Sequence, residues 1–230
     1  TRQIRRDALM VKKGEHKMVK KHLTAILLAL PIMFGLTGCT GGVNGEGSSN
    51  YSYDIGTPIV RGNAFNDQGW ENIAKGQYDS AITQFNKVLN DNPTDDEKAE
   101  ANNGVGWAKS HLGALKDGIP WFEKAKDISD DAKVGLAAAY IQKASKSDME
   151  IVVDLLYKQL GKENPQFKYS ARRNTGVSDA EVHAMLAYAF AATGNDDSAR
   201  EQLDYAKELN PDYANTTIDQ MAKAIEFLLN

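Results

Sequence analysis

The stretch that most constrains the fold is residues 69–93, whose pattern predicts two short helices joined by a tight turn. In its second half the apolar residues recur at the three- and four-residue spacing of an amphipathic helix. These apolar residues are Ala81, Ile82, Phe85, Val88 and Leu89. Asp79 is the expected N-cap of this helix, and Pro93 ends it because the residue before a proline avoids the helical region. A pair this short cannot bury its apolar face alone, so further pairs are expected beside it.

Related pairs recur along the chain. Gly106 and Trp107 repeat Gly69 and Trp70 at a spacing of 37 residues. The same offset relates four more residues of the second pair to the first, namely Asn103, Gly113, Phe122 and Ala125. Toward the C-terminus the pattern of small and apolar positions returns at Ala187, Gly194, Ala199, Leu203, Ala206 and Pro211. The sequence therefore predicts a helical repeat with small residues where helices cross.

This self-similarity resembles the tetratricopeptide repeat, whose period is about 34 residues. The matching positions of the first repeat are Gly69, Gly76, Tyr78, Ala81, Phe85 and Pro93, with Phe65 in place of the leading Trp. The departures are Gln68, Asn72 and Val88 in the first repeat, and Gly118 with no closing proline in the second. The resemblance covers residues 62–230. It implies an all-α superhelix of antiparallel helix pairs over residues 63–230, closed by a C-terminal capping helix.

The hydrophobic pattern places nine helices in this domain. The expected helices are residues 63–75, 79–91, 96–112, 117–127, 131–145, 148–161, 178–193, 196–209 and 213–229. Pro120 falls in a first helical turn, where its missing N–H has no cost. The third pair is the weakest match, because its register against the repeat is ambiguous.

The segment before the domain resembles a secretory signal. Residues 1–38 are interpreted as upstream residues followed by a signal peptide, with Met18 as the expected start. Lys20 and Lys21 precede an apolar run at residues 23–34, which is 12 residues long. That length is too short to span a hydrocarbon core of roughly 30 Å as a helix, and it suits a cleaved signal.

The run ends in Leu36, Thr37, Gly38 and Cys39, which resembles the bacterial lipobox. The resemblance implies that Cys39 becomes the lipidated, palmitate-bearing N-terminus of the mature chain. The alternatives are a signal anchor with an incidental cysteine, or a cysteine buried in the core, although Cys39 is the only cysteine in the sequence and directly follows the apolar run. Residues 39–62 would then be a flexible tether rich in Gly, Ser and Asn. Because Thr40 is not aspartate, the resemblance favours the outer membrane, facing the periplasm.

Processing would change the charge of the chain. Residues 1–38 hold 8 of the 27 Lys and Arg and 2 of the 31 Asp and Glu, so the chain from Cys39 onward has 19 basic and 29 acidic residues. A net charge of −10 makes nucleic acid and anionic lipid unexpected partners for the domain.

The residues that usually carry catalysis are sparse. From Cys39 onward the sequence has two histidines, His111 and His183, and neither lies in a metal-binding spacing. His183 falls where it should face the partner helix of its own repeat. The acidic pairs at residues 95–96 and 130–131 lie at helix starts, where they complement the helix dipole. We therefore expect no catalytic residues, no metal site and no cofactor, and an enzyme is not the expected function.

The resemblance instead implies binding, because the first helices of tetratricopeptide repeats line a concave groove. The groove positions carried over by register are Asn66, Trp70, Ile73, Asn103, Trp107 and Ser110. The asparagines would bond a peptide backbone, and the Trp side chains would give an apolar wall. The equally weighted alternative is that both Trp side chains pack between repeats.

The insert, defined as residues 161–178, separates the third and fourth pairs. Its Lys168, Arg172 and Arg173 form a candidate second surface, although a solvated loop is the favoured interpretation. The function expected from the whole sequence is a lipid-anchored envelope adaptor or scaffold that binds a protein or peptide partner. The alternatives are an envelope enzyme or carrier that uses the insert as a substrate loop, and a structural lipoprotein that self-assembles through residues 213–229.

Overall fold

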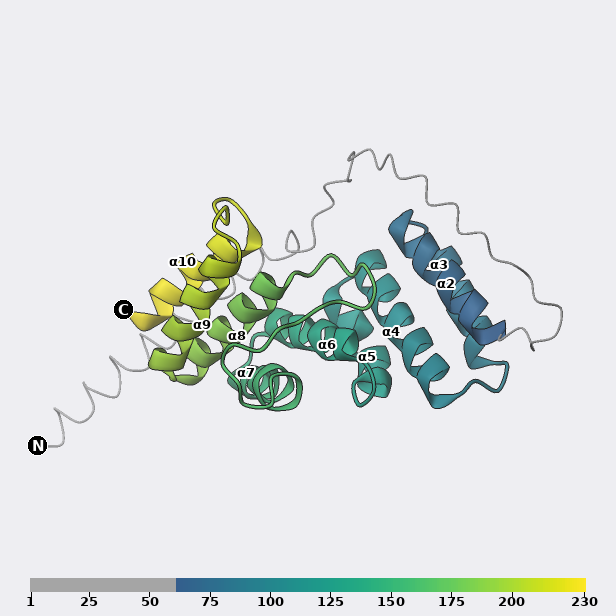
Figure 1. Ribbon diagram of the computed structural model, residues 1–230, viewed down its shortest axis with the longest axis horizontal. Helices are drawn as coiled ribbons and strands as arrows, with labels where there is room; N and C mark the ends of the chain where they lie inside the picture. Colours follow the sequence, from purple (N-terminus) through teal and green to yellow (C-terminus); the bar gives the residue numbers. More distant parts are fainter. Residues whose placement is uncertain (1–60) are drawn as a thin grey trace, which may run out of the picture.

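The computed structural model describes residues 61–230, and within that range every regular element is helical. The elements in chain order are α2 (Arg61–Ala74), α3 (Tyr78–Leu89), α4 (Asp95–Leu112), the 3-10 turn η2 (Leu115–Gly118), α5 (Ile119–Ala125), α6 (Asp130–Lys143), α7 (Lys146–Val153), the π-helical η3 (Asp154–Leu160), α8 (Asp179–Thr193), α9 (Asp196–Leu209) and α10 (Thr217–Leu229). Successive helix pairs lie along the long axis, from α2 and α3 at one end to α9 and α10 at the other (Figure 1). The expected all-α superhelix of helix pairs is confirmed.

Close helix crossings explain the glycines of the repeat. The fully buried ring of Phe85 on α3 lies against Gly69 of α2 and Gly104 of α4. A Cβ at either glycine would overlap that ring. The second repeat packs in the same way, since the buried ring of Phe122 lies against Gly106 of α4 and Gly135 of α6. A large aromatic ring on the second helix of each pair therefore fills the space that two glycines leave open.

Local sequence signals set most helix starts. Thr94 and Glu97 form a reciprocal capping box at α4, in which each side chain satisfies a free backbone N–H of the first turn. Pro120 lies in the first turn of α5, as predicted. The predicted cap at Asp79 is wrong, because α3 begins at Tyr78 and has no side-chain cap. Asp79 lies instead in the first turn, where its negative charge complements the helix dipole.

Two helices in the centre of the molecule are buried on nearly all sides. Every residue from 131 to 139 of α6 is buried, and so is the run from 182 to 191 of α8. Helices α5, α7 and α8 all contact α6, which explains why its sequence has no clear polar face. After α6 the expected helix at 148–161 divides into α7 and the π-helical η3.

The last helix covers the final pair but begins later than predicted. The sequence predicts a start at residue 213, whereas α10 begins at Thr217. Residues 211–216 form turns in which the Thr216 hydroxyl donates to the carbonyl of Tyr213 and Asn215 adopts a positive φ. From Thr217 onward, Ile218, Met221 and Ile225 are buried in contact with α8 and α9. The capping helix is therefore present and shorter at its N-terminal end.

Candidate functional site

The two Trp side chains of the candidate groove lie inside their own repeats. Trp70 on α2 is 7% exposed, and Trp107 on α4 is 1% exposed. The ring of Trp70 meets Phe85 edge-on with centroids 5.7 Å apart, and Trp107 meets Phe122 in the same way at 5.4 Å. Both rings are thus packed, but each lies against the partner helix of its own repeat and not between repeats as the packing alternative expected. Contact between either Trp and a peptide stays a prediction.

The polar groove candidates are also largely buried. Asn66 is 1% exposed, and its side-chain amide donates to the carbonyl of Glu97 at 3.2 Å. Asn103 is 3% exposed, and the Oδ1 atoms of both asparagines have no hydrogen-bond partner in the described part of the chain. Ser110 donates to the carbonyl of Gly106 at 2.8 Å. Ile73, at 8% exposed, belongs to the core.

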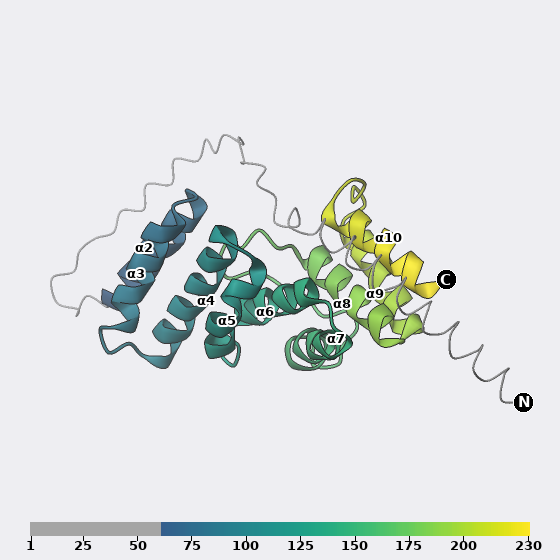
Figure 2. The same ribbon diagram turned by 180° about the vertical axis from the view of Figure 1, so that it is seen from behind.

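The insert runs over α6 and reaches α4, on the near face in Figure 1 and behind α6 in Figure 2. Asp131 of α6 holds it through three hydrogen bonds. Its Oδ1 accepts from the Tyr169 hydroxyl at 2.8 Å and from the backbone N–H of Arg172 at 3.2 Å, and its Oδ2 accepts from the N–H of Arg173 at 3.1 Å. Burial, together with the charge of Asp131, raises the pKa of Tyr169. Asp131 is thus the docking point for a segment about 40 residues away in sequence.

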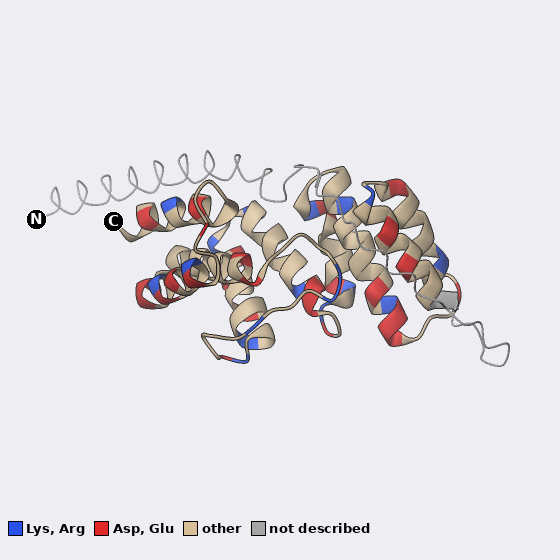
Figure 3. Cartoon of the chain, turned by 45° about the horizontal axis from the view of Figure 1, so that its top comes forward, with Lys and Arg blue, Asp and Glu red and all other residues tan. Residues whose placement is uncertain are grey.

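The arginines of the insert reach the first two repeats. Arg173 donates to Glu100 Oε1 at 2.5 Å and to Asp67 at 2.8 Å. Arg172 lies 3.2 Å from the other oxygen of Glu100. Burial opposes the charge of Arg173, but its hydrogen bonds to Asp67 and Glu100 raise its pKa overall. In Figure 3 basic residues of the insert, in blue, lie beside acidic residues of the helices, in red.

A buried polar network fixes the start of the insert. His183 of α8 is fully buried, as its position in the repeat predicted, and its ring nitrogens lie 2.7 Å from Gln202 Oε1 and 2.9 Å from the carbonyl of Phe167. Gln202 also donates to the carbonyl of Pro165 at 2.8 Å. Asp179 accepts the N–H of Tyr169 at 2.8 Å. The solvated loop favoured from the sequence is therefore wrong, because side chains of several helices bind the insert's backbone.

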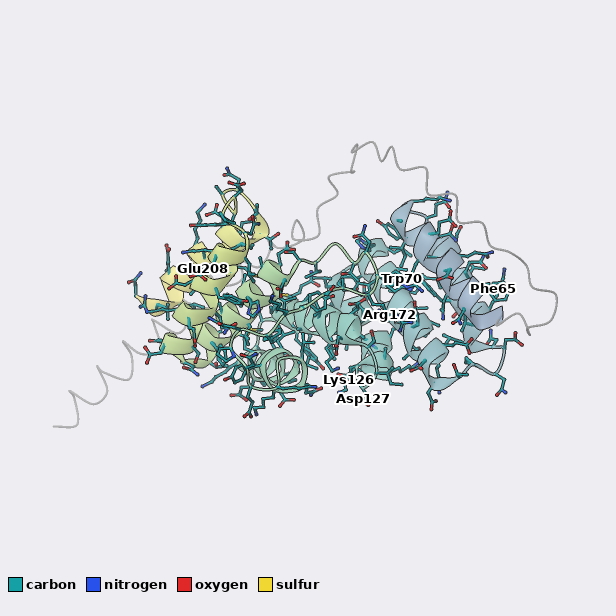
Figure 4. All side chains as sticks on the ribbon, viewed as in Figure 1. Phe65, Trp70, Lys126, Asp127, Arg172 and Glu208 are labelled. Carbon is teal, nitrogen blue, oxygen red and sulfur yellow. The ribbon has the colours of Figure 1, made fainter. Side chains whose placement is uncertain are left out.

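Between the insert and the first turns of α4 and α6 lies a cavity of about 170 Å³. Its walls include Asp96, Glu100, Asn103, Ile128 and Asp130, with Arg172 and Arg173 on the insert side. Figure 4 places Arg172 in the same part of the molecule as Trp70, away from Phe65 at the start of α2 and from Glu208 on α9. Lys168, the third member of the candidate second surface, is exposed. Of the candidate site residues from the sequence, the cavity brings together Asn103 from the groove and Arg172 and Arg173 from the insert, and the other candidates lie outside its lining.

Within residues 61–230 there is no group of His, Cys, Asp and Glu able to hold a metal ion. No helix in that part of the chain combines the length and apolarity needed to cross a membrane. Cys39 and the lipobox residues Leu36, Thr37 and Gly38 lie outside the described residues, as do the signal peptide and residues 39–60 of the expected tether. Residues 61 and 62, which the sequence assigned to the tether, belong to α2.

Comparison with known proteins supports the repeat assignment. A protein-family model described as tetratricopeptide repeat matches residues 66–133, which run from α2 into the start of α6. No curated protein matches the chain. The match covers the two pairs in which the glycine and phenylalanine crossings are clearest. Tetratricopeptide repeats generally bind protein partners and are typically non-catalytic scaffolds.

Proposed function

We propose that this protein is a lipid-anchored adaptor or scaffold of the bacterial envelope that binds a protein or peptide partner through its repeat domain. The observation that carries the binding role is the tetratricopeptide match at residues 66–133, on helix pairs whose inner face holds an open cavity. The proposal of a lipid anchor is supported by the sequence alone, since Leu36, Thr37 and Gly38 precede the single cysteine at the end of a signal-like run. An acyl chain gains about 0.8 kcal/mol per buried CH₂, which supports stable attachment when several chains are present.

The anchor is tested by intact-mass analysis of the membrane-extracted protein. The expected mass is that of a chain beginning at Cys39 with added acyl groups. Cys39→Ser should leave the protein unprocessed and without the acyl mass. An unmodified wild-type chain that retains the residues before Cys39 would exclude the lipoprotein proposal and leave the repeat domain untouched.

Partner binding is tested by affinity capture of the tagged full chain from detergent-solubilised envelopes. Ile128 lines the cavity and is 51% exposed, so Ile128→Asp should lose the captured protein without disturbing the core. Leu209 at the end of α9 is 37% exposed, and Leu209→Asp is the matched control that should retain it. Helical content by circular dichroism checks that both variants fold. Equal retention by both variants would argue against binding beside the insert.

The insert arginines bear on the alternative of an envelope enzyme or carrier, in which they would bind a substrate. Arg173 is engaged by Glu100 and Asp67, so it supports the fold of the insert. Arg172 is 73% exposed, so it is the arginine that such an enzyme or carrier would present to a substrate. Self-assembly through α10 remains the other alternative, and sedimentation of the full chain at several concentrations tests it.

A further inference from the structure

The cavity beside the insert has walls of a defined chemistry. Asp96 and Asp130 are exposed carboxylates at the starts of α4 and α6, and Glu100 lies deeper with 9% of its side chain exposed. Ile128 adds an exposed apolar surface at the rim. Asn103 is 97% buried at the wall, and its Oδ1 has no partner among the described residues. A buried acceptor without a donor is unusual in a folded protein, because its desolvation is uncompensated.

The chain's own arginines indicate which group this wall binds. Glu100 presents one carboxylate oxygen to Arg173 and the other to Arg172. Arg173 is 29% exposed and has Asp67 as a second partner. Arg172 is 73% exposed, and its ion pair with Glu100 is at 3.2 Å. Because the Arg172 side chain lies mostly in water and Glu100 also has Arg173 as a partner, the contact of Arg172 with Glu100 is the weaker of the two and is replaceable.

The remaining charges favour a cation over an anion. The acidic residues that line the cavity are Asp96, Glu100, Asp130 and Asp131, of which Asp131 is already bonded through both oxygens to the insert. Lys133, on the same helix as Asp130, lies 2.7 Å from it, with 11% of its side chain exposed. An anion would meet this acidic wall, whereas a guanidinium would find carboxylate partners and an apolar surface for its aliphatic stem.

We infer that this cavity is a side-chain pocket for an arginine of the partner, which replaces Arg172 on the second oxygen of Glu100. The inference rests on the proposed adaptor function and adds the chemistry of the bound segment. Arginine is favoured over lysine because its planar guanidinium carries five N–H donors, so one group can bond Oε2 of Glu100 and a rim carboxylate together, whereas an ammonium is a point charge. Arg172 then serves as an internal competitor that keeps the buried carboxylate paired while no partner is present.

The test uses Nα-acetyl-arginine methylamide as the probe and the citrulline derivative, its neutral isostere, as the control. Each is titrated into the isotope-labelled full chain, and amide resonances of residues near Glu100 and Asp130 are followed by NMR. The arginine probe should shift them in a saturable way, and the citrulline probe should not. Identical shifts with both probes, or no shift with either, would overturn the inference.

Two variants should change the affinity for the arginine probe in opposite directions. Arg172→Ala removes the internal competitor, so it should tighten binding of the arginine probe by up to about fivefold, the equivalent of one exposed ion pair. Asp130→Asn removes an exposed carboxylate from the rim and should weaken binding without touching the contacts of the insert backbone. Weaker binding in Arg172→Ala would overturn the inference, because it would make Arg172 part of the binding site.

The same variants separate this inference from the adaptor proposal. If Arg172→Ala and Asp130→Asn capture the envelope partner as the wild type does, the adaptor survives and the arginine pocket is excluded. If the arginine probe binds as expected but no protein is captured from envelopes, the pocket survives and the adaptor proposal fails.

Discussion

The hydroxyl of Tyr169 donates to Oδ1 of Asp131 at 2.8 Å, and it joins the insert to the first turn of a helix 38 residues earlier in the chain. Two backbone N–H groups of the insert bind the same carboxylate. Asp131 is 3% exposed, so almost none of this bonding is shared with water. One acidic side chain therefore fixes the path of the insert over the inner face of the repeats.

Removal of this carboxylate should release the insert. Asp131→Ala leaves a buried hydroxyl and two N–H groups without their charged acceptor, and the expected loss of unfolding free energy is on the order of 3 kcal/mol. Trypsin should then cleave faster at Lys168, Arg172 and Arg173. Asp130→Ala is the control, because Asp130 is exposed and forms its ion pair with Lys133 of its own helix. Equal cleavage of the two variants would contradict this role for Asp131.

Tyr169 should make stability depend on alkaline pH. Burial and Asp131 raise its pKa, so the native state holds the hydroxyl proton more tightly than the unfolded chain does. This contribution is complete below the unfolded pKa of about 10 and is lost as the pH rises above it. Denaturant unfolding from about pH 8 to about pH 11 should show a steeper decline for wild type than for Tyr169→Phe. Parallel declines would argue against the Tyr169–Asp131 bond.

His111 should make the stability of the domain depend on acidic pH. Its ring stacks on Tyr78 with centroids 4.7 Å apart, and burial lowers its pKa. The native state therefore favours the neutral ring, so its contribution is complete above the unfolded pKa of about 6.5 and is lost as the pH falls below that value. His111→Phe keeps a stacked ring and removes the titration. The difference in unfolding free energy between variant and wild type should shift in favour of the variant between about pH 7 and about pH 5.

The glycine crossings give a packing prediction. Gly104→Ala places a Cβ against the ring of Phe85 and should cost about 1–3 kcal/mol of unfolding free energy. A smaller side chain facing the new methyl group should relieve the overlap. The double variant Gly104→Ala with Phe85→Leu should therefore lose less than the sum of its single changes, as a double-mutant cycle in urea measures. Strict additivity would mean that the methyl group is accommodated elsewhere.

The repeat pattern predicted most of the fold because its signals are local. Spacing, helix caps and prolines gave the type and approximate bounds of the helices, and Gly69 was correctly expected at a helix crossing. Gly104 and Gly135 lie on the first helix of the following repeat, so only the assembled pairs reveal that they face Phe85 and Phe122. The π-helical η3 has no sequence signal that differs from an ordinary apolar stripe.

The candidate site was less predictable, because its contacts join distant segments. Register placed Trp70 and Trp107 on the first helices but could not determine how deeply each ring would pack. Asp131 looked like a residue that complements a helix dipole, since nothing near it in sequence reveals the insert that it binds. The role of Gln202 was equally hidden, because its partners His183 and Pro165 belong to other elements.

The bond between Arg173 and Asp67 spans 106 residues of sequence, in an architecture where each unit ordinarily touches only the next. A linear array of such units melts from its ends, and its parts fold in any order. Here the insert joins the first pair to the fourth, so fraying of the end pair also breaks the ion pair between Arg173 and Asp67. The domain is therefore expected to unfold more cooperatively and to fold more slowly than an array without the insert, because its long-range contacts raise the contact order.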